Sequence, residues 1–136
     1  MDKIDLYVKG HSGGNVGAWA YVLSVPEKHK SLRGTVENAS HNQMEIEACI
    51  QGLSTLTRPC AVTIYSNSTY LQGGIALLAS GTHYDTHLLA WQRFINAAAP
   101  HTIECVHTPK AQNSGYMRLA DSLALNLIPP QYRRGA

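Results

Sequence analysis

The order of the hydrophobic patterns is the feature that most constrains the fold of this chain. Residues 4–9 alternate apolar and polar side chains, which is the period of a β-strand. A glycine-rich turn cluster at residues 10–15 and two further strand-like segments follow, at residues 17–25 and 32–37. The spacing of three and four residues that is typical of a helix begins only after Asn38. The first part of the chain is therefore predicted to be an antiparallel meander of three strands.

The remainder of the chain alternates helices with strands. Helices are expected from a cap at Ser40 or Asn42 to about residue 57, and at residues 68–78, 84–99 and 115–127, with strands at residues 61–65 and 103–106. This order predicts an α/β fold with a five-stranded mixed sheet, in which three antiparallel strands are followed by αβ units and helices cover both faces. The 136 residues match the size of one domain, so a single domain is expected over residues 1–136.

The charge balance and the cysteines limit the classes of function that the chain can have. The formal net charge is +2, which permits a nucleic-acid partner without providing a strong general attraction for one. The three cysteines form no Cys-x-x-Cys pair, so buried thiols in a reducing compartment are expected rather than a zinc or redox motif. No apolar run approaches the roughly 20 residues of a membrane span, and residues 1–5 lack the apolar stretch of a signal peptide. We therefore expect a cytoplasmic protein with no membrane partner.

Four short motifs lie on the predicted elements. They are the strand and turn of residues 7–23, the helix start HNQMEIEA at residues 41–48, the strand end IYSNSTYL at residues 64–71 and the helix segment ADSLA at residues 120–124. Together, in this order, they resemble the ribonuclease H (type 1) family nearly from end to end. The corresponding patterns of the family are Asp-Gly-Ser with Gly-x-Gly-apolar, Asn-x-Met-Glu-x-x-Ala, Asp-Ser-x-Tyr-apolar and Ala-Asp-x-Leu-Ala. The resemblance implies a ribonuclease H-like fold.

The resemblance also implies a set of site residues. Members of this family hydrolyse the RNA strand of an RNA–DNA hybrid, and four carboxylates hold two Mg²⁺ ions about 4 Å apart. Carried over position by position, two of these carboxylates are Glu45 and Asp121, but the other two positions hold Lys9 and Asn67. Lys9 has three donors and no acceptor, so it cannot bind Mg²⁺, and Asn67 offers a carbonyl oxygen without a charge. Glu45 and Asp121 remain as weak metal ligands at best.

These replacements decide the predicted function. We expect Lys9 to pair with Glu45 or Asp121 and to replace the metal as counter-charge, so no cofactor is expected. The prediction is a ribonuclease H-like protein that is unable to carry out two-metal hydrolysis and serves as a nucleic-acid or protein binding module. The first alternative is an active, Mg²⁺-dependent hybrid endonuclease with an altered or mutated site. The second is a structural module similar to the connection domains of reverse transcriptases.

The same resemblance suggests residues that contact the substrate. Asn15 and Asn42 match positions that contact the backbone or a 2′-hydroxyl of the hybrid, and an amide can both donate and accept, as that hydroxyl requires. Ser68 and Thr69 follow the third site residue and could contact phosphate. Turn or capping chemistry is the alternative for each of the four. The expected partners are an RNA–DNA hybrid or another nucleic acid, bound weakly, or a protein. The basic pair at residues 133–134 is interpreted as solvated charge, with a phosphate contact as the alternative.

Overall fold

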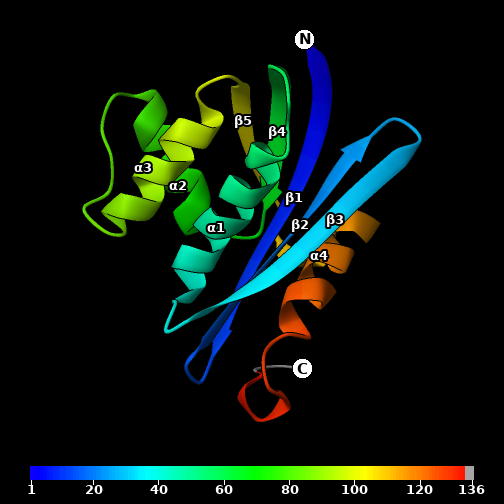
Figure 1. Cartoon of the computed structure of the whole chain (residues 1–136), viewed down its shortest axis with the longest axis vertical. Helices are drawn as coiled ribbons and strands as arrows, with labels where there is room; N and C mark the ends of the chain where they lie inside the picture. Colours follow the sequence, from blue (N-terminus) through cyan, green and yellow to red (C-terminus); the bar gives the residue numbers. More distant parts are fainter. Residues whose placement is uncertain (134–136) are drawn as a thin grey trace.

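A computed structural model describes residues 1–133 of the chain (Figure 1). Its elements, in chain order, are β1 (Asp2–Gly13), β2 (Val16–Val25), β3 (Lys28–Glu37), α1 (His41–Ser54), β4 (Cys60–Ser66), α2 (Thr69–Ala79), α3 (Leu88–Ala98), β5 (Thr102–His107), the 3₁₀ turn η1 (Lys110–Gln112), α4 (Gly115–Leu125) and the 3₁₀ turn η2 (Pro130–Tyr132). The end of the expected domain, residues 134–136, lies outside the described residues, and Arg134 of the basic pair lies there with it.

The strands form one mixed sheet in the order β3-β2-β1-β4-β5. β1 pairs antiparallel with β2, and β2 with β3, whereas β4 lies parallel to both β1 and β5. Figure 1 shows α1, α2 and α3 on one face of the sheet and α4 on the other. The predicted α/β fold, with a five-stranded mixed sheet and helices on both faces, is thus confirmed.

The start of α1 is set by a reciprocal cap. The Ser40 hydroxyl accepts a hydrogen bond from Gln43 N at 3.2 Å, and Gln43 Oε1 accepts one from Ser40 N at 2.8 Å. This capping box satisfies two N–H groups that a helix start otherwise leaves unpaired. Of the two caps that the sequence allows, the helix therefore uses Ser40, and Asn42 lies within the first turn.

Several element boundaries differ from those predicted. α1 ends about a turn early, because the Thr55 hydroxyl donates to the Gly52 carbonyl at 2.7 Å and closes the last helical turn. β3 begins at Lys28, before the predicted start, because its pairing with β2 continues to that residue. α3 begins only at Leu88, because His87 before it has a left-handed φ of 52°, which a helix cannot contain.

Most of the predicted glycine-rich turn is strand. The pairing of β1 with β2 continues to Gly13, so Gly14 and Asn15 alone form the turn. Gly14 has a φ of +61°, a left-handed conformation that glycine adopts without strain. Because alternate residues of a strand share a face, His11 lies on the same side of β1 as Lys9.

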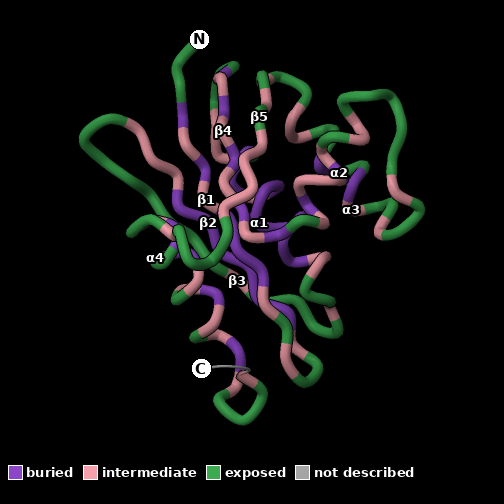
Figure 2. Tube along the Cα trace, turned by 180° about the vertical axis from the view of Figure 1, so that it is seen from behind, coloured by how far each residue is buried: buried purple, intermediate pink, exposed green. Residues whose placement is uncertain are grey.

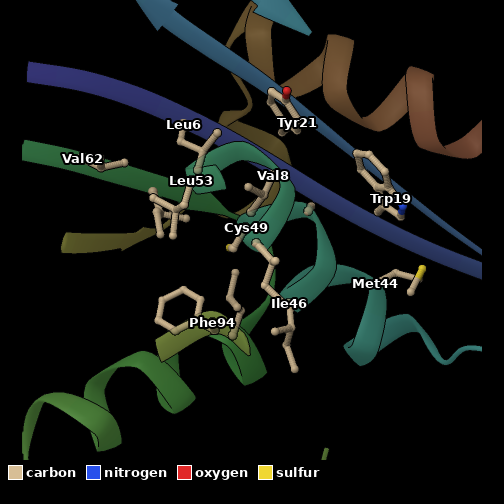
Figure 3. Packing of buried hydrophobic residues seen from close by; sticks show 14 of the residues in the cluster. Leu6, Val8, Trp19, Tyr21, Met44, Ile46, Cys49, Leu53, Val62 and Phe94 are labelled. Atoms are coloured by element: carbon tan, nitrogen blue, oxygen red, sulfur yellow. The ribbon is translucent and has the colours of Figure 1, made fainter. Parts of the chain in front are cut away.

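The main hydrophobic core lies between the sheet and helices α1 and α3. Figure 3 shows Leu6 and Val62 of the strands close to Leu53 of α1, with Phe94 of α3 on the far side of that helix. The buried members of this cluster are Ile4, Leu6, Val8, Trp19, Tyr21, Met44, Ile46, Ala48, Cys49, Ile50, Leu53, Cys60, Val62, Ile64, Leu71, Trp91 and Phe94. Figure 2 shows the same pattern along the trace, with the central strands and α1 buried. Cys49 and Cys60 are buried free thiols, as predicted, and Cys105 is half-buried.

Two close contacts fix the position of the helices against the strands. A Cβ added at Gly10 would lie 2.5 Å from the backbone nitrogen of Glu45, so α1 lies directly on β1 at that glycine. On the other face of the sheet, a second cluster contains Ala18 and Ala20 of β2, Ala124 of α4 and Ile128. The small side chains let α4 approach the sheet closely. α1 and α4 therefore pack from opposite faces against the same stretch of the β1–β2 pair. Within residues 1–133, no helix has the length and apolar character needed to cross a bilayer.

Candidate functional site

Lys9 lies near the carboxyl end of β1 and is almost completely buried, with 2% of its surface exposed. Its Nζ donates to Asn67 Oδ1 at 3.1 Å and lies 3.9 Å from Asp121 Oδ1. The contact with Asn67 arises because β1 and β4 are parallel neighbours, and Asn67 follows the last residue of β4. Burial lowers the pKa of Lys9, while the negative charges of Glu45 and Asp121 raise it in part. Asp121, one of the two partners expected for this ammonium, is thus in contact with it.

Asn67 uses both ends of its amide. Its Oδ1 accepts from Lys9, and its Nδ2 donates to the Thr108 carbonyl at 2.7 Å and to Asn113 Oδ1 at 2.8 Å. An aspartate at this position would present an oxygen, without a proton, to both of those acceptors. The loop after β5 is therefore arranged around an amide at residue 67, and not around a carboxylate.

Glu45 lies on α1 and is fully buried. Its Oε1 accepts from Gly10 N at 3.0 Å, and the Ser66 hydroxyl lies 3.5 Å from its Oε2. Burial raises the pKa of Glu45 to about 7, although the charge of Lys9 and the bond from Gly10 lower it in part. At neutral pH the carboxyl is consequently divided between its charged and its neutral form, which weakens it as a counter-charge.

Asp121 of α4 bonds a histidine that the sequence did not indicate as a site residue. The Asp121 Oδ1 atom lies 2.8 Å from Nε2 of His11. Burial lowers the pKa of His11, and the contact with Asp121 opposes this shift in part. The alternation along β1, which places His11 two residues after Lys9 on the same face, is the signal that could have identified it.

His41 and Lys110 complete the group and were also missed. The His41 ring lies 6.2 Å from the His11 ring, centroid to centroid, and its Nε2 is 3.4 Å from Oε1 of Glu45. Burial, together with the positive charges of Lys9, His11 and Lys110, lowers the pKa of His41 to about 4. Lys110 lies in η1, far from these residues in sequence, so no local spacing could have indicated it. The cluster thus contains more basic than acidic side chains.

The residues proposed to contact substrate are placed differently from one another. Asn15 is exposed in the turn after β1, and its carbonyl accepts from Asn38 N at 2.8 Å, which ties the turn to the segment before α1. Ser68 is buried and caps α2 by accepting from Leu71 N at 3.0 Å, so its hydroxyl has the capping role that was the alternative. Thr69, the next residue, is exposed.

Residues 1–133 contain no group of three or more His, Cys, Asp or Glu side chains that could hold a metal ion. The Oδ1 atoms of Asn67 and Asp121 already lie 3.1 Å and 3.9 Å from the Lys9 ammonium, which reduces the number of free oxygen donors at this site.

Comparison with known proteins identifies the family to which this chain is related. A family model described as RNase H matches residues 2–126. The chain belongs to the ribonuclease H family. The ribonuclease H of Caldanaerobacter subterraneus subsp. tengcongensis is 32% identical over an alignment 139 residues long, gaps included, and the alignment covers 92% of this chain and 90% of the relative.

Solved structures of the family share the fold at lower identity. The N-terminal RNase H domain of a Mycobacterium tuberculosis protein superposes with a TM-score of 0.75 at 18% identity and covers 93% of each chain. RNase H1 from the archaeon Halobacterium salinarum superposes with a TM-score of 0.71 at 21% identity, covering 90% of this chain and 94% of its own. The type 1 family and its fold, which the motifs predict, are thereby confirmed.

Proposed function

We propose that this member of the ribonuclease H family binds RNA–DNA hybrids without a divalent metal and does not hydrolyse them by a two-metal route. The observation that carries the proposal is the position of Lys9 Nζ, 3.1 Å from Asn67 Oδ1 and 3.9 Å from Asp121 Oδ1. By the family resemblance, these three side chains occupy three of the four metal-binding positions. The ammonium therefore supplies positive charge where the metal ions would supply it.

The donor set does not fit a pair of Mg²⁺ ions. Mg²⁺ requires oxygen ligands in near-octahedral geometry, whereas the Oδ1 atoms of Asn67 and Asp121 face the Lys9 ammonium and the His11 ring respectively. At about 4 Å and an effective dielectric constant near 20, one unit of positive charge repels a dication by about 8 kcal/mol before relaxation. The buried carboxyl of Glu45, whose pKa is raised to about 7, offers little compensation.

Binding of a hybrid is supported by the family and by the side chains that surround Lys9. Lys110 and Asn15 are exposed, and Asn42 is half-exposed at the start of α1. The His11 and His41 rings lie 6.2 Å apart, centroid to centroid, so the end of β1 is adjacent to the start of α1, and Lys110 lines the same pocket as both rings. With a net charge of only +2, attraction to a polyanion is modest, and we expect weak, salt-sensitive binding.

The test is a pair of measurements on the same labelled hybrid. Fluorescence anisotropy should show no gain in affinity when EDTA is replaced by MgCl₂ at matched ionic strength, because no metal bridges protein and phosphate. The affinity should decrease as the salt concentration increases. Incubation of the hybrid with Mg²⁺ or Mn²⁺ should leave the RNA strand intact. Cleavage that disappears in Glu45→Gln would establish the active alternative instead. A complete absence of hybrid binding at low salt would overturn the nucleic-acid role.

A further inference from the structure

A pocket of about 630 Å³ opens beside the site, between the β1–β2 turn, the start of α1 and the segment after α4. His11 and His41 of the site line it, together with Tyr132 and Arg133 of the segment after α4. Its volume lies in the usual range for small-molecule sites and is far larger than a single phosphate group requires. The pocket is therefore large enough for a ligand of nucleotide size.

The charged side chains that line this pocket are basic. Lys110 and Arg133 line the pocket, and among its described lining residues there is neither an aspartate nor a glutamate. The positive charge of Lys110 lowers the pKa of both His11 and His41, so its field reaches both rings that face the cavity. Two fixed positive charges without a carboxylate favour an anion of similar charge.

The side of the pocket that carries Arg133 is held in place by specific contacts. The guanidinium donates from Nε to the Ile128 carbonyl at 2.8 Å and from Nη2 to the Asn126 carbonyl at 3.3 Å, so it is fixed against the end of α4. A Cβ at Gly14 would lie 2.7 Å from the Tyr132 ring, which shows how closely the segment after α4 lies against the β1–β2 turn (Figure 1). The cation is thus positioned in advance and loses little freedom on binding a ligand.

We propose that this pocket binds the phosphomonoester group of a nucleotide, with Lys110 and Arg133 as its charge partners. A phosphomonoester carries close to two negative charges at neutral pH, which matches the two cations. The Tyr132 ring in the wall provides a surface on which the base can stack. The ligand is either a free nucleoside 5′-monophosphate or the phosphorylated 5′ end of an RNA strand. This site goes beyond the proposed hybrid binding and does not depend on it.

The test is calorimetric titration of the full chain with adenosine 5′-monophosphate, adenosine and inorganic phosphate. The monophosphate should bind best and adenosine worst, because the charge and the base act together. Lys110→Ala and Arg133→Ala should each weaken the binding about tenfold, the effect of losing one charge-assisted hydrogen bond. Lys28→Ala, which removes a cation from a different pocket at β3, is the matched control and should change nothing.

A second arm identifies the source of the phosphate. A short oligoribonucleotide with a 5′-phosphate that binds more tightly than both its 5′-hydroxyl form and the free monophosphate would assign the site to an RNA end. Equal binding of the two oligonucleotides, with the free monophosphate still bound, would assign it to a free nucleotide. Absence of monophosphate binding, or binding that neither alanine variant weakens, would overturn the proposal. Hybrid anisotropy on the same samples reports the proposed function separately.

Discussion

Replacing Glu45 with glutamine should change how the stability of the protein depends on pH. Burial raises the pKa of Glu45 from 4.5 to about 7 in the folded state. Between these two values the folded protein keeps the proton that the unfolded chain has already lost. The free energy of unfolding that Glu45 contributes is thus greatest below pH 4.5 and is lost as the pH rises through about 7.

The size of this effect follows from the shift itself. One pKa unit corresponds to about 1.4 kcal/mol, so the wild type should lose about 3 kcal/mol across this interval relative to a variant without the titrating group. Glutamine retains an oxygen that can accept the hydrogen bond from Gly10, and it carries no charge at any pH. The difference in stability between Glu45→Gln and the wild type should consequently move in favour of the variant as the pH rises from 4.5 to 8.

The assay is urea unfolding followed by circular dichroism at a series of pH values. His41 opposes Glu45 in the wild type: its pKa is lowered to about 4, so its contribution to stability is present above pH 6.5 and is lost as the pH falls through 4. Because the His41 side chain is 46% exposed, solvent screening reduces that contribution to about 1 kcal/mol. The wild-type curve alone therefore underestimates the effect of Glu45, and the difference between variant and wild type isolates it.

Glu47→Gln, on the same helix, is the matched control. Arg93 binds Glu47 through two hydrogen bonds, at 2.6 Å and 3.1 Å, and, despite its burial, the pKa of Glu47 is lowered. The contribution of Glu47 to the free energy of unfolding is therefore fully present above pH 4.5. The difference in stability between Glu47→Gln and the wild type should accordingly be constant from pH 5 to 8. A constant difference for Glu45→Gln over the same range would refute the reasoning, because it would mean that the buried carboxyl does not titrate there.

Three further outcomes are expected. Gly10→Ala should lower the free energy of unfolding by about 3 kcal/mol in urea, because the added Cβ would lie 2.5 Å from a backbone nitrogen of α1. Gly115→Ala, whose Cβ would have no neighbour within 4 Å, should be neutral or stabilising. Equal effects of the two substitutions would argue against the close contact at Gly10. In calorimetry, the double variant Lys9→Asp with Asn67→Asp should bind Mg²⁺, whereas the wild type should not. Mg²⁺ should also raise the melting temperature of this variant. Binding of Mg²⁺ by the wild type would contradict the role given to the Lys9 ammonium. Arg93→Gln should cost at most about 1 kcal/mol, since the Arg93 side chain is 52% exposed, and a larger loss would show that the pair acts as a buried one.

The fold could be predicted because its signals are local. The alternation along residues 4–9 and the helical spacing after Asn38 report which side of each element is buried, and the order of elements leaves few sheet arrangements. The first and last residues of the strands and helices were less certain, since they depend on segments that are distant in the sequence. β3 continues back to Lys28 because β2 extends alongside it, and α3 starts late because His87 has a left-handed backbone.

The four family positions could also be located from the sequence, but their contacts could not. The resemblance to the family implies that Lys9, Glu45, Asn67 and Asp121 belong to one site. The Asn67 amide donates to Thr108 and Asn113, however, and these acceptors lie in a loop whose path no local pattern specifies. Whether an amide or a carboxylate suits position 67 therefore depends on the acceptors that this loop places beside it, and not on the residue alone.

The sequence by itself determined that this chain has the ribonuclease H fold, and the family resemblance led us to expect a lysine at one of the family's carboxylate positions. Only the tertiary structure decided what surrounds that lysine. His11 and Lys110 are 99 positions apart in the sequence, yet the charge of Lys110 reaches the His11 ring because β1 and the loop after β5 meet at the same end of the sheet. Periodicity reports which face of an element is buried, whereas charge acts through space, and the distances between elements exist only in the folded chain.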